Sequence, residues 1–429
     1  MANPYIVGSP VLYSQLYGRD ELIEKCYADV NNNIWLLGRR RSGKTSVLCA
    51  IKEFALEKKE WFPVYVTLED CFSDDDIKKS FLRDFRDNLE KFDIEDKYQP
   101  PDGEQDFADS VDDICRWLNE RDIGLLLLID EIERIEDLGG EGSRLEAKLR
   151  GVLGRREPRL RMIIAASRVL RTRKKVVTSP FINLFRPEYL GAISKEEARK
   201  LIRQEKNPEI KIQVADEVMD EILEKTGSEP YLIQYLCHRL YNEDNSLRIP
   251  TDEDLNQPDI GLKLIFENDY QFLERDEQYI LNRIAQGHQI SSASIPVELI
   301  RLGYIKKVNN HYRIGNHFLE TWLQIKVVRE LSPLDESSEE YDLSATDNKL
   351  LKQFYRLVDI FIIIFGLGLL LFEFAVLRHI LNPLQVTIVL LATVILGAAI
   401  LIFAGRYTDI IGETIFYKLL SRVVKNIQK

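Results

Sequence analysis

A glycine-rich stretch near the N-terminus, running from Gly38 to Thr45, matches the pattern G-x-x-x-x-G-K-[ST] in full. Glycines let the backbone wrap around phosphates with several N–H groups pointing inward, and a helix that follows adds its positive N-terminus. In this pattern Lys44 reaches the β- and γ-phosphates of a nucleoside triphosphate, and the hydroxyl of Thr45 is a ligand of Mg²⁺. The predicted nucleotide-contacting residues of the stretch are Gly38, Arg41, Ser42, Gly43, Lys44, Thr45 and Ser46.

An acidic pair ends the apolar run IGLLLLIDEIERI. Asp130 would hold Mg²⁺ through a water molecule, and Glu131 would polarise the attacking water. Buried strands often end in acids, so the pair is a weak signal alone but a strong one downstream of a complete phosphate loop. Arg168 follows another apolar run, where it would either sense a γ-phosphate or form a surface salt bridge. The predicted catalytic residues are therefore Lys44, Asp130, Glu131 and Arg168, with Thr45 and Asp130 as the metal-binding residues.

Almost continuously apolar runs alternate with amphipathic stretches over residues 1–192 and predict a parallel sheet covered on both faces. The expected strands are 33–38, 61–68, 123–130, 160–167 and 187–193. Between the second and third lies an acidic helical insertion, residues 73–122, in which Ile77, Phe81, Phe85 and Leu89 form the packing face. We expect an α/β P-loop NTPase domain of the ASCE type.

After residue 192 the pattern becomes helical. Ser194 and Glu197 predict a capping box at the start of one helix, Gly227 predicts the end of a second, and Pro230 predicts the start of a third. We expect a helical lid over residues 193–262. Residues 263–328 show helices followed by a hairpin with Asn309 and Asn310 at its tip and a last helix, which predicts a winged helix.

The C-terminal part has the composition of a membrane anchor. Residues 329–350 are acidic and rich in serine, which predicts a flexible linker. Residues 384–405 contain no charged residue, and as a helix these 22 residues would span about 33 Å, enough for a bilayer core of about 30 Å. With the similar run 359–377 they predict a transmembrane hairpin over residues 351–405, in contact with lipid through 357–405. A buried helical hairpin of a soluble domain is the less favoured alternative.

The flanking basic residues set the expected orientation. Lys349, Lys352 and Arg356 precede the first span and Arg406 follows the second, so both ends of the chain are predicted to be cytoplasmic. Glu373 would lie either at the headgroup level or in an oligomeric interface or pore. The basic amphipathic tail, residues 406–429, would lie on an anionic membrane surface or form an oligomerising coiled coil.

Composition narrows the function classes. The formal net charge of -11 argues against non-specific binding of nucleic acid as the main activity. The five cysteines are scattered without a CxxC pair, which predicts reduced thiols and no disulfide framework or zinc site. The first ten residues lack the charged and apolar regions of a cleavable signal peptide.

With these motifs, the chain resembles STAND-type P-loop ATPases of the AAA+ kind, and in particular archaeal-type ATPases whose loop reads GRRRxGKT. The resemblance covers roughly residues 12–325. LYGRDELI is similar to a family motif that packs against adenine, which implies that Tyr17 and Gly18 contact the base. Ser167 and Arg168 resemble a sensor pair. TGSEPYLIQY resembles a lid motif in which Pro230 contacts nucleotide, although Ser228 replaces the usual second glycine.

The resemblance implies a switch that is closed with ADP and oligomeric with ATP, and that hydrolyses ATP slowly. It also implies a homo-oligomer and an unidentified protein trigger, and by analogy a role in defence or stress signalling. The winged-helix region lacks the His-x-Asp triplet with which immune receptors hold ADP. The candidates for an arginine finger are Arg171, Arg173 and Arg186, among which the sequence does not choose.

Two other functions remain open. Origin-recognition ATPases share this layout, and a DNA-binding ATPase is favoured by Lys306, Lys307 and Arg313 and by the basic run 168–175. The acidic chain opposes it, as does the helix VELIRLG, which has only one arginine and one glutamate. The second is a non-catalytic scaffold that uses the nucleotide as a structural plug. The intact Lys44, Asp130 and Glu131 argue against a scaffold, because a dead site does not need a water-activating acid.

Overall fold

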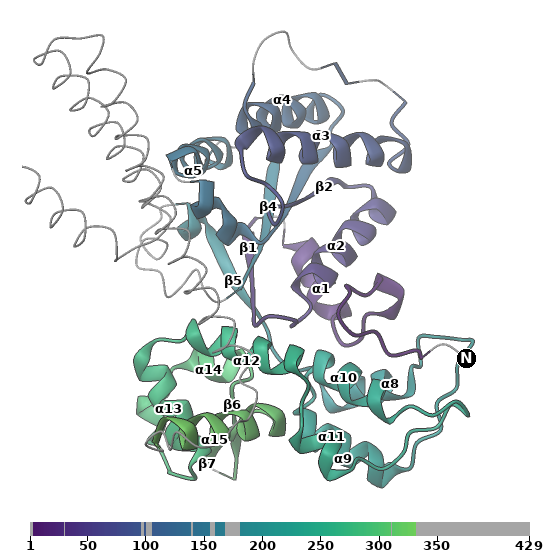
Figure 1. Ribbon diagram of the computed structural model, residues 1–429. Coiled ribbons are helices and arrows are strands. Elements are labelled where there is room, and N and C mark those ends of the chain that lie inside the picture. The colour runs from purple at the N-terminus through teal and green to yellow at the C-terminus, as the bar shows by residue number, and fades with distance from the viewer. Residues whose placement is uncertain are drawn as a thin grey trace, which may run out of the picture. The chain divides into compact units, whose positions relative to one another are not determined.

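The computed structural model describes residues 3–331 apart from 30, 96–97, 100–104, 139, 155–158, 168–180 and 310. Its N-terminal half is built on a five-stranded parallel sheet (Figure 1). The strands are β1 (Asn33–Gly38), β2 (Trp61–Thr67), β3 (Gly124–Asp130), β4 (Leu160–Ala166) and β5 (Phe185–Leu190), in the order β2-β3-β4-β1-β5. One strand, β4, separates β1 from β3. The chain therefore has an α/β P-loop fold.

Helices cover both faces of the sheet, as the apolar strands require. One face packs against α1 (Asp20–Ala28) and α2 (Lys44–Lys58), and the other against α3 (Asp74–Lys91), α4 (Phe107–Asn119) and α5 (Gly140–Leu153). The predicted insertion is thus the helix pair α3 and α4. Its predicted packing face is buried at Ile77, Phe81 and Phe85 and half-buried at Leu89. Short 3-10 turns occur at Tyr13–Gln15, Ile132–Leu138, Ile182–Leu184 and Ser292–Ser294.

Four of the strand predictions agree with the structure within one residue, and the fifth was wrong in position. The fifth strand begins at Phe185 and ends at Leu190, not at residues 187–193. This strand lies at the edge of the sheet, where Arg186 is exposed and pairs with Asp29. Because the start of the strand includes this exposed charged residue, the apolar pattern did not predict where the strand begins. Beyond Leu190 the chain leaves the sheet. The backbone N–H of Ile193 donates to the carbonyl oxygen of Ser228 and not to a neighbouring strand.

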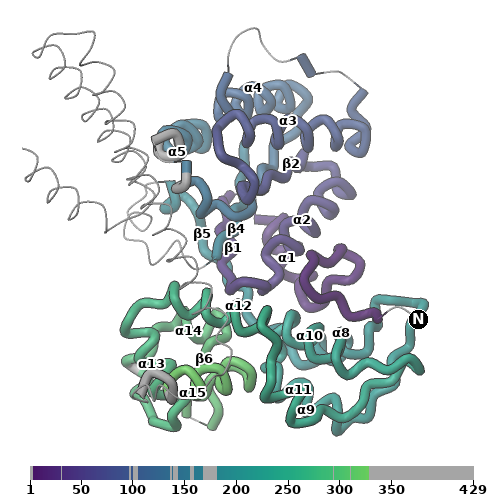
Figure 2. The backbone as a smooth tube through the Cα atoms, in the orientation of Figure 1, coloured from purple at the N-terminus to yellow at the C-terminus, as the bar shows by residue number. Residues whose placement is uncertain are grey.

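The second half of the described chain is mainly helical, and its elements pack around one apolar core. Its elements are α8 (Lys195–Arg203), α9 (Asp216–Thr226), α10 (Pro230–Leu240), α11 (Asp252–Asn256), α12 (Ile260–Gln271), α13 (Arg275–Ala285), α14 (Val297–Arg301), β6 (Ile305–Val308), β7 (His311–Ile314) and α15 (His317–Leu331). Figure 2 follows this path from α8 to α15. The last elements include the hairpin β6–β7 and a final helix, α15, which runs three residues beyond the predicted domain limit of 328.

The helix caps agree with the predictions except at Glu197. Helix α9 ends at Gly227, which has a φ of 62°, and α10 starts at Pro230. The hydroxyl of Ser194 accepts from the N–H of Glu197 at 3.2 Å, so half of the predicted capping box is present. The carboxylate of Glu197 accepts instead from the N–H of Gly18 at 3.0 Å. It therefore joins α8 to the start of α1.

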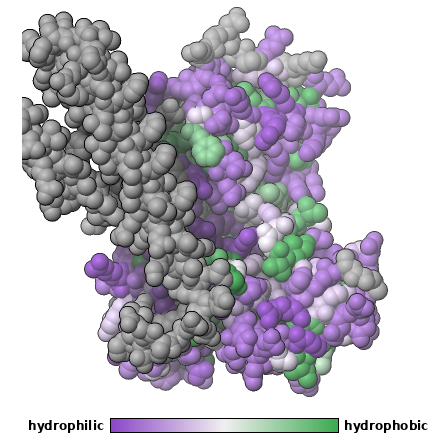
Figure 3. Space-filling view, in the orientation of Figure 1, coloured by the Kyte–Doolittle hydropathy of each residue, from purple (hydrophilic) through white to green (hydrophobic). Residues whose placement is uncertain are grey.

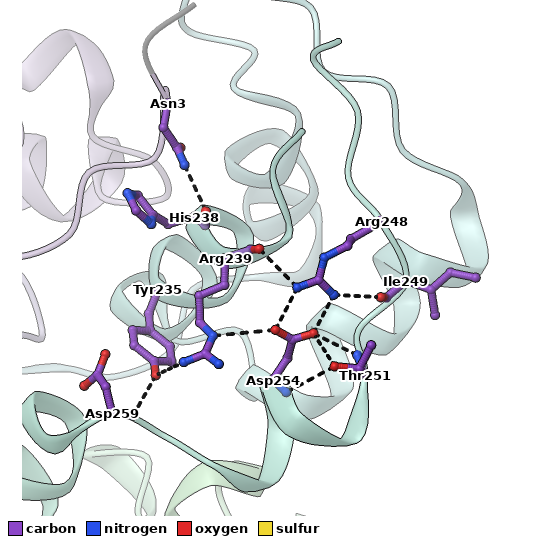
Figure 4. A network of polar contacts seen from close by, with 9 residues as sticks. All are labelled: Asn3, Tyr235, His238, Arg239, Arg248, Ile249, Thr251, Asp254 and Asp259. Carbon is purple, nitrogen blue, oxygen red and sulfur yellow. Dashed lines mark hydrogen bonds and ion pairs between the residues drawn. The ribbon is translucent and has the colours of Figure 1, made fainter. Parts of the chain in front are cut away.

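A polar network fastens the end of α10 to the elements that follow (Figure 4). The carboxylate of Asp254, whose side chain is 5% exposed, accepts from Arg248 at 2.9 Å and lies 3.6 Å from Nε of Arg239. The hydroxyl of Tyr235 accepts from Arg239 and from the N–H of Asp259, each at 3.1 Å. The hydrogen bond from Arg248 holds the pKa of Asp254 well below its usual range against the effect of burial, and hydrogen bonds from Thr251 lower it further.

The predicted linker beyond Leu331, the transmembrane hairpin 351–405 and the tail 406–429 lie outside the described residues, as does Glu373. Within the described part of the chain, every helix is too short or too polar to cross a bilayer. The described residues in the view of Figure 3 are mainly hydrophilic, with apolar side chains in small groups. All five cysteines are free, and Cys26, Cys115 and Cys237 are buried.

Candidate nucleotide site

The phosphate loop connects β1 to α2, and its glycines are needed for its shape. A Cβ at Gly38 would lie 2.1 Å from the Oγ of Ser42, and Gly43 has a φ of 91° directly before the helix starts. Arg41 also has a positive φ, 63°. The ammonium of Lys44 donates to the carbonyl oxygens of Gly38 and Arg39 at 3.2 and 3.1 Å, so it lies over the loop. The loop thus presents backbone N–H groups, an ammonium and a helix N-terminus to one place.

The predicted metal-binding residues are hydrogen-bonded to each other. The hydroxyl of Thr45 donates to Oδ2 of Asp130 at 2.6 Å, and the hydroxyl of Tyr65 donates to the same oxygen at 3.2 Å. Asp130 is 2% exposed, and its Oδ1 accepts from the N–H of Glu131. A hydroxyl and a carboxylate are the oxygen ligands that Mg²⁺ prefers, so these residues fit the predicted ion. Sequence analysis did not identify Tyr65, which is unremarkable within a strand.

Glu131 is held in an uncommon backbone conformation, with a φ of 53°. Such conformations are uncommon outside glycine and collect at functional sites. Burial raises the pKa of the Glu131 carboxyl, and the charges of Glu133, Glu69 and Asp130 raise it further, whereas Lys44 lowers it. The Nε of Arg134, a residue that sequence analysis missed, is 4.0 Å from Oε2 of Glu131.

The phosphate loop, Asp130 and Glu131 line one cavity of about 810 Å³. The predicted site residues that line it are Tyr17, Arg41, Ser42, Gly43, Lys44, Thr45, Ser46, Asp130, Glu131 and Pro230. Such a volume is within the usual range of small-molecule sites. Apolar side chains line one part of it, among them Ile6, Val11 and Leu16, and they offer a surface for a flat ring.

An N-terminal segment, residues 3–11, crosses from the lid to the phosphate loop and was not predicted as part of the site. The N–H of Ile6 donates to Gln234 on α10 at 3.2 Å, and the N–H of Val11 donates to the hydroxyl of Ser46 on α2 at 3.1 Å. Arg41 donates to the carbonyl oxygen of Gly8. Ser46 therefore lines the cavity with its hydroxyl bonded to the segment. Only Gly8 and Pro10 mark this extended stretch in the sequence, which is a weak signal.

Of the two residues expected to contact the base, Tyr17 lines the cavity and Gly18 does not. Tyr17 lines the cavity, and its hydroxyl accepts from the N–H of Lys206 at 2.7 Å. The structure places Gly18 outside the cavity lining. With a φ of 65°, it lies so close to Ile193 that a Cβ would be 2.9 Å away. Gly18 is therefore needed for packing α1 against the lid, and its expected contact with a base has no support here.

The lid motif contributes Pro230, which lines the cavity at the start of α10. Gly227 and Ser228 precede it with φ values of 62° and 59°. Ser228 therefore has a left-handed conformation, at the position where the resemblance to STAND-type ATPases leads us to expect a glycine. The carbonyl oxygen of Ser228 accepts from Ile193, which explains why this conformation is held.

The predicted sensor and finger arginines are mostly outside the described residues. Arg168, Arg171 and Arg173 fall in 168–180. Ser167 is described, and its N–H donates to Oε1 of Glu133 at 2.9 Å, so the end of β4 is tied to the turn after Asp130. Arg186 is the second residue of β5, at the opposite end of the strand from the phosphate loop, and pairs with Asp29 at 2.7 Å.

Solved structures with a similar chain path include nucleotide-binding proteins. A Walker-type ATPase of Pyrococcus abyssi is 17% identical, covers 75% of this chain and 99% of its own, and has a TM-score of 0.49. The ORC2 protein of Aeropyrum pernix is 14% identical over 75% of this chain and 98% of its own, with a TM-score of 0.48. No protein-family model and no curated protein sequence matches the chain. At these scores the likeness carries no conclusion about substrate or partner.

Proposed function

We propose that this protein is a Mg²⁺-dependent ATPase in which slow hydrolysis of ATP to ADP resets a conformational switch. The observation that carries the proposal is the convergence of Lys44, Thr45, Asp130 and Glu131 on one cavity, with the Thr45 and Asp130 side chains 2.6 Å apart. Complete phosphate-binding, metal-binding and water-activating groups are what a P-loop ATPase uses.

Each residue has a role that follows from its chemistry. Lys44 and the loop N–H groups hold the β- and γ-phosphate oxygens, because they supply positive charge with little reorganisation. Thr45 and Asp130 hold Mg²⁺, which when bound neutralises charge on the phosphates. Glu131 accepts a hydrogen bond from the attacking water and orients it toward the γ-phosphate. The apolar part of the cavity, with Tyr17, receives the base.

The switch and the membrane anchor are the finer parts of the proposal. ATP binding would bring several copies together, and the predicted hairpins over residues 351–405 would gather in or at the bilayer. The uncharged run 384–405 supports the anchor, and the lid contact of Pro230 with the cavity supports movement of the lid with the nucleotide. A defence or stress role rests on family analogy alone.

The described residues favour this proposal over a DNA-binding ATPase. Arg301, the arginine of the short helix α14, stacks 5.1 Å above the ring of Tyr189 on β5. Burial lowers the pKa of Lys306, which is half-buried in β6. Helix α14 exposes Val297 and Ile300 instead of a basic surface. A basic recognition helix would instead present exposed, unstacked cations to the DNA backbone.

The test is the nucleotide content, phosphate release and particle size of the full chain in detergent. Wild type is compared with Glu131→Gln, and with Glu120→Gln as a control at an exposed position. We expect wild type to carry ADP and turn over slowly, and Glu131→Gln to retain ATP and form a defined oligomer. If both remain monomeric with either nucleotide, the switch is wrong. If wild type releases no phosphate in the presence of Mg²⁺, the ATPase assignment is wrong.

A further inference from the structure

One arginine of the phosphate loop does not point to the nucleotide cavity but into the helical half of the protein. Arg39, directly after Gly38, has a side chain that is only 6% exposed. Its Nη1 donates to Oε1 of Glu229 at 2.8 Å, and its Nε to Oδ2 of Asp269 at 3.3 Å. The guanidinium also lies 4.6 Å from the centre of the Tyr304 ring. A single loop side chain therefore contacts three separate parts of the helical half.

The two carboxylates are themselves anchored. Glu229 directly precedes Pro230, and its Oε1 also accepts from the amide of Asn316 at 2.8 Å. The side-chain oxygen of Asn316 accepts from the N–H of Leu319 at 2.8 Å, so this contact reaches the start of α15. Asp269 lies near the end of α12, and its Oδ1 accepts from the N–H of Arg40, a second residue of the loop, at 3.4 Å. The loop backbone is therefore hydrogen-bonded to α12, and the Arg39 side chain is linked to the start of α15 through Glu229 and Asn316.

Two carboxyl groups face one guanidinium in this cluster, which lies beside the phosphate site. Burial raises the pKa of both carboxyls, and the charge of Arg39 opposes that rise. The charge of Lys44 also lowers the pKa of Asp269. The same ammonium donates to the carbonyl oxygen of Arg39 at 3.1 Å. Lys44 thus stabilises the cluster as long as no phosphate competes for it.

We propose that the Arg39–Glu229–Asp269 cluster couples the phosphate site to the helical half, such that a γ-phosphate weakens its ion pairs and ADP preserves them. A γ-phosphate attracts the ammonium of Lys44 and adds negative charge near the two carboxyl groups that pair with Arg39. ADP adds less negative charge at this place. The coupling is reciprocal, so the intact cluster disfavours ATP relative to ADP. This inference rests on the proposed ATPase function and names the regulation of the same site.

The test compares ATP and ADP binding to the full chain by competition with a fluorescent ADP analogue, in a Glu131→Gln background that prevents turnover. Asp269→Asn keeps the acceptor for Arg39 and removes the negative charge, and Glu229→Gln does the same on the other side. Each variant is expected to shift the ratio of ATP to ADP affinity toward ATP by on the order of tenfold. The matched control is Glu267→Gln on the same helix, because Glu267 pairs with Lys326 and not with the loop.

A second measurement follows amide hydrogen exchange in α12 of the same background protein. ATP is expected to speed exchange in α12 relative to ADP, and Asp269→Asn is expected to reduce that difference. An unchanged affinity ratio in variants that bind both nucleotides overturns the coupling and leaves the ATPase proposal standing. An equal shift in Glu267→Gln also overturns it, because a general charge effect would then be sufficient. A background protein that binds neither nucleotide overturns the proposed function together with the coupling.

Discussion

The side chains of Thr45 and Asp130 meet at 2.6 Å although 85 positions separate them in the chain. Thr45 lies at the start of α2, just after β1, and Asp130 ends β3. Because the strands are parallel, their carboxyl ends lie on the same edge of the sheet, and β4 between them sets the spacing. The sheet therefore positions the metal-binding pair, and the two motifs have no need to be close in sequence.

Replacing Asp130 by Asn should separate nucleotide binding from hydrolysis. We expect Mg²⁺-dependent phosphate release to fall by on the order of a hundredfold or more, because the carboxylate charge on the metal is lost. Binding of ADP without Mg²⁺ should change little, since the phosphate loop is intact. Phosphate release and ADP binding with and without chelator measure the two effects. Asp109→Asn, at a half-exposed position in α4, is the control; full activity in Asp130→Asn would contradict the assignment.

Hydrolysis should fail at acidic pH as Glu131 takes up a proton. The pKa of this carboxyl is raised above 4.5, first by burial and then by Glu133. Since only the carboxylate can accept a hydrogen bond from water, kcat should fall as pH drops through that raised pKa. Glu133→Gln removes one like charge and keeps an acceptor for Ser167. The acidic limb of a kcat profile should therefore move to lower pH in this variant, and a move to higher pH would refute the explanation.

Ser228 is a position at which a glycine should stabilise the protein. A serine with a φ of 59° is strained in the folded state, whereas a glycine is not. The greater conformational freedom of glycine in the unfolded state offsets part of this gain. Ser228→Gly should raise the free energy of unfolding by about 0.5–1 kcal/mol. The neighbouring Gly227→Ala should do the opposite, because its Cβ would lie 2.3 Å from the carbonyl oxygen of Gly315. Denaturant unfolding of both variants tests the pair, and a destabilised Ser228→Gly would contradict it.

Local patterns were enough to predict the phosphate loop, the acidic pair and most strands. The loop needs glycines at fixed positions, and β3 is apolar along its whole length because both of its faces are covered. These constraints act within a few residues, so they can be seen in the sequence. The edge strand β5 was misplaced because exposed residues such as Arg186 replace the apolar signal at its start.

Long-range partners could not be predicted in the same way. Glu197 has the spacing of a capping residue, yet its carboxylate binds the N–H of Gly18, which is 179 positions away. Sequence analysis gave no role to Arg39, yet its side chain is buried against Glu229 and Asp269. The segment 3–11 has no motif, and its place at the cavity depends on single hydrogen bonds to Gln234 and Ser46. Such contacts depend on the packing of the whole unit.

Asp254 should make the stability of the helical half depend on acid pH. Its pKa is lowered in the folded state, first by the hydrogen bond from Arg248. A lowered pKa means that the contribution is present above the unfolded value of about 3.9 and is lost as pH falls through the lower folded value. Asp254→Asn should reduce the free energy of unfolding at neutral pH by about 2 kcal/mol and flatten its decline in acid. Unfolding curves from neutral to acidic pH measure both, and Asp252→Asn at an exposed position of α11 is the control.

The predicted membrane anchor can be tested with one charge in its second span. The full chain should remain with the membrane fraction after an alkaline carbonate wash, because the run 384–405 has no charged residue. Leu391→Arg places a charge near the centre of that run at a cost of about 3 kcal/mol, so a measurable part of the protein should be released. Leu343→Arg, in the predicted linker, should leave the distribution unchanged. Release of the unaltered chain by the wash would contradict the anchor, whatever the behaviour of the ATPase.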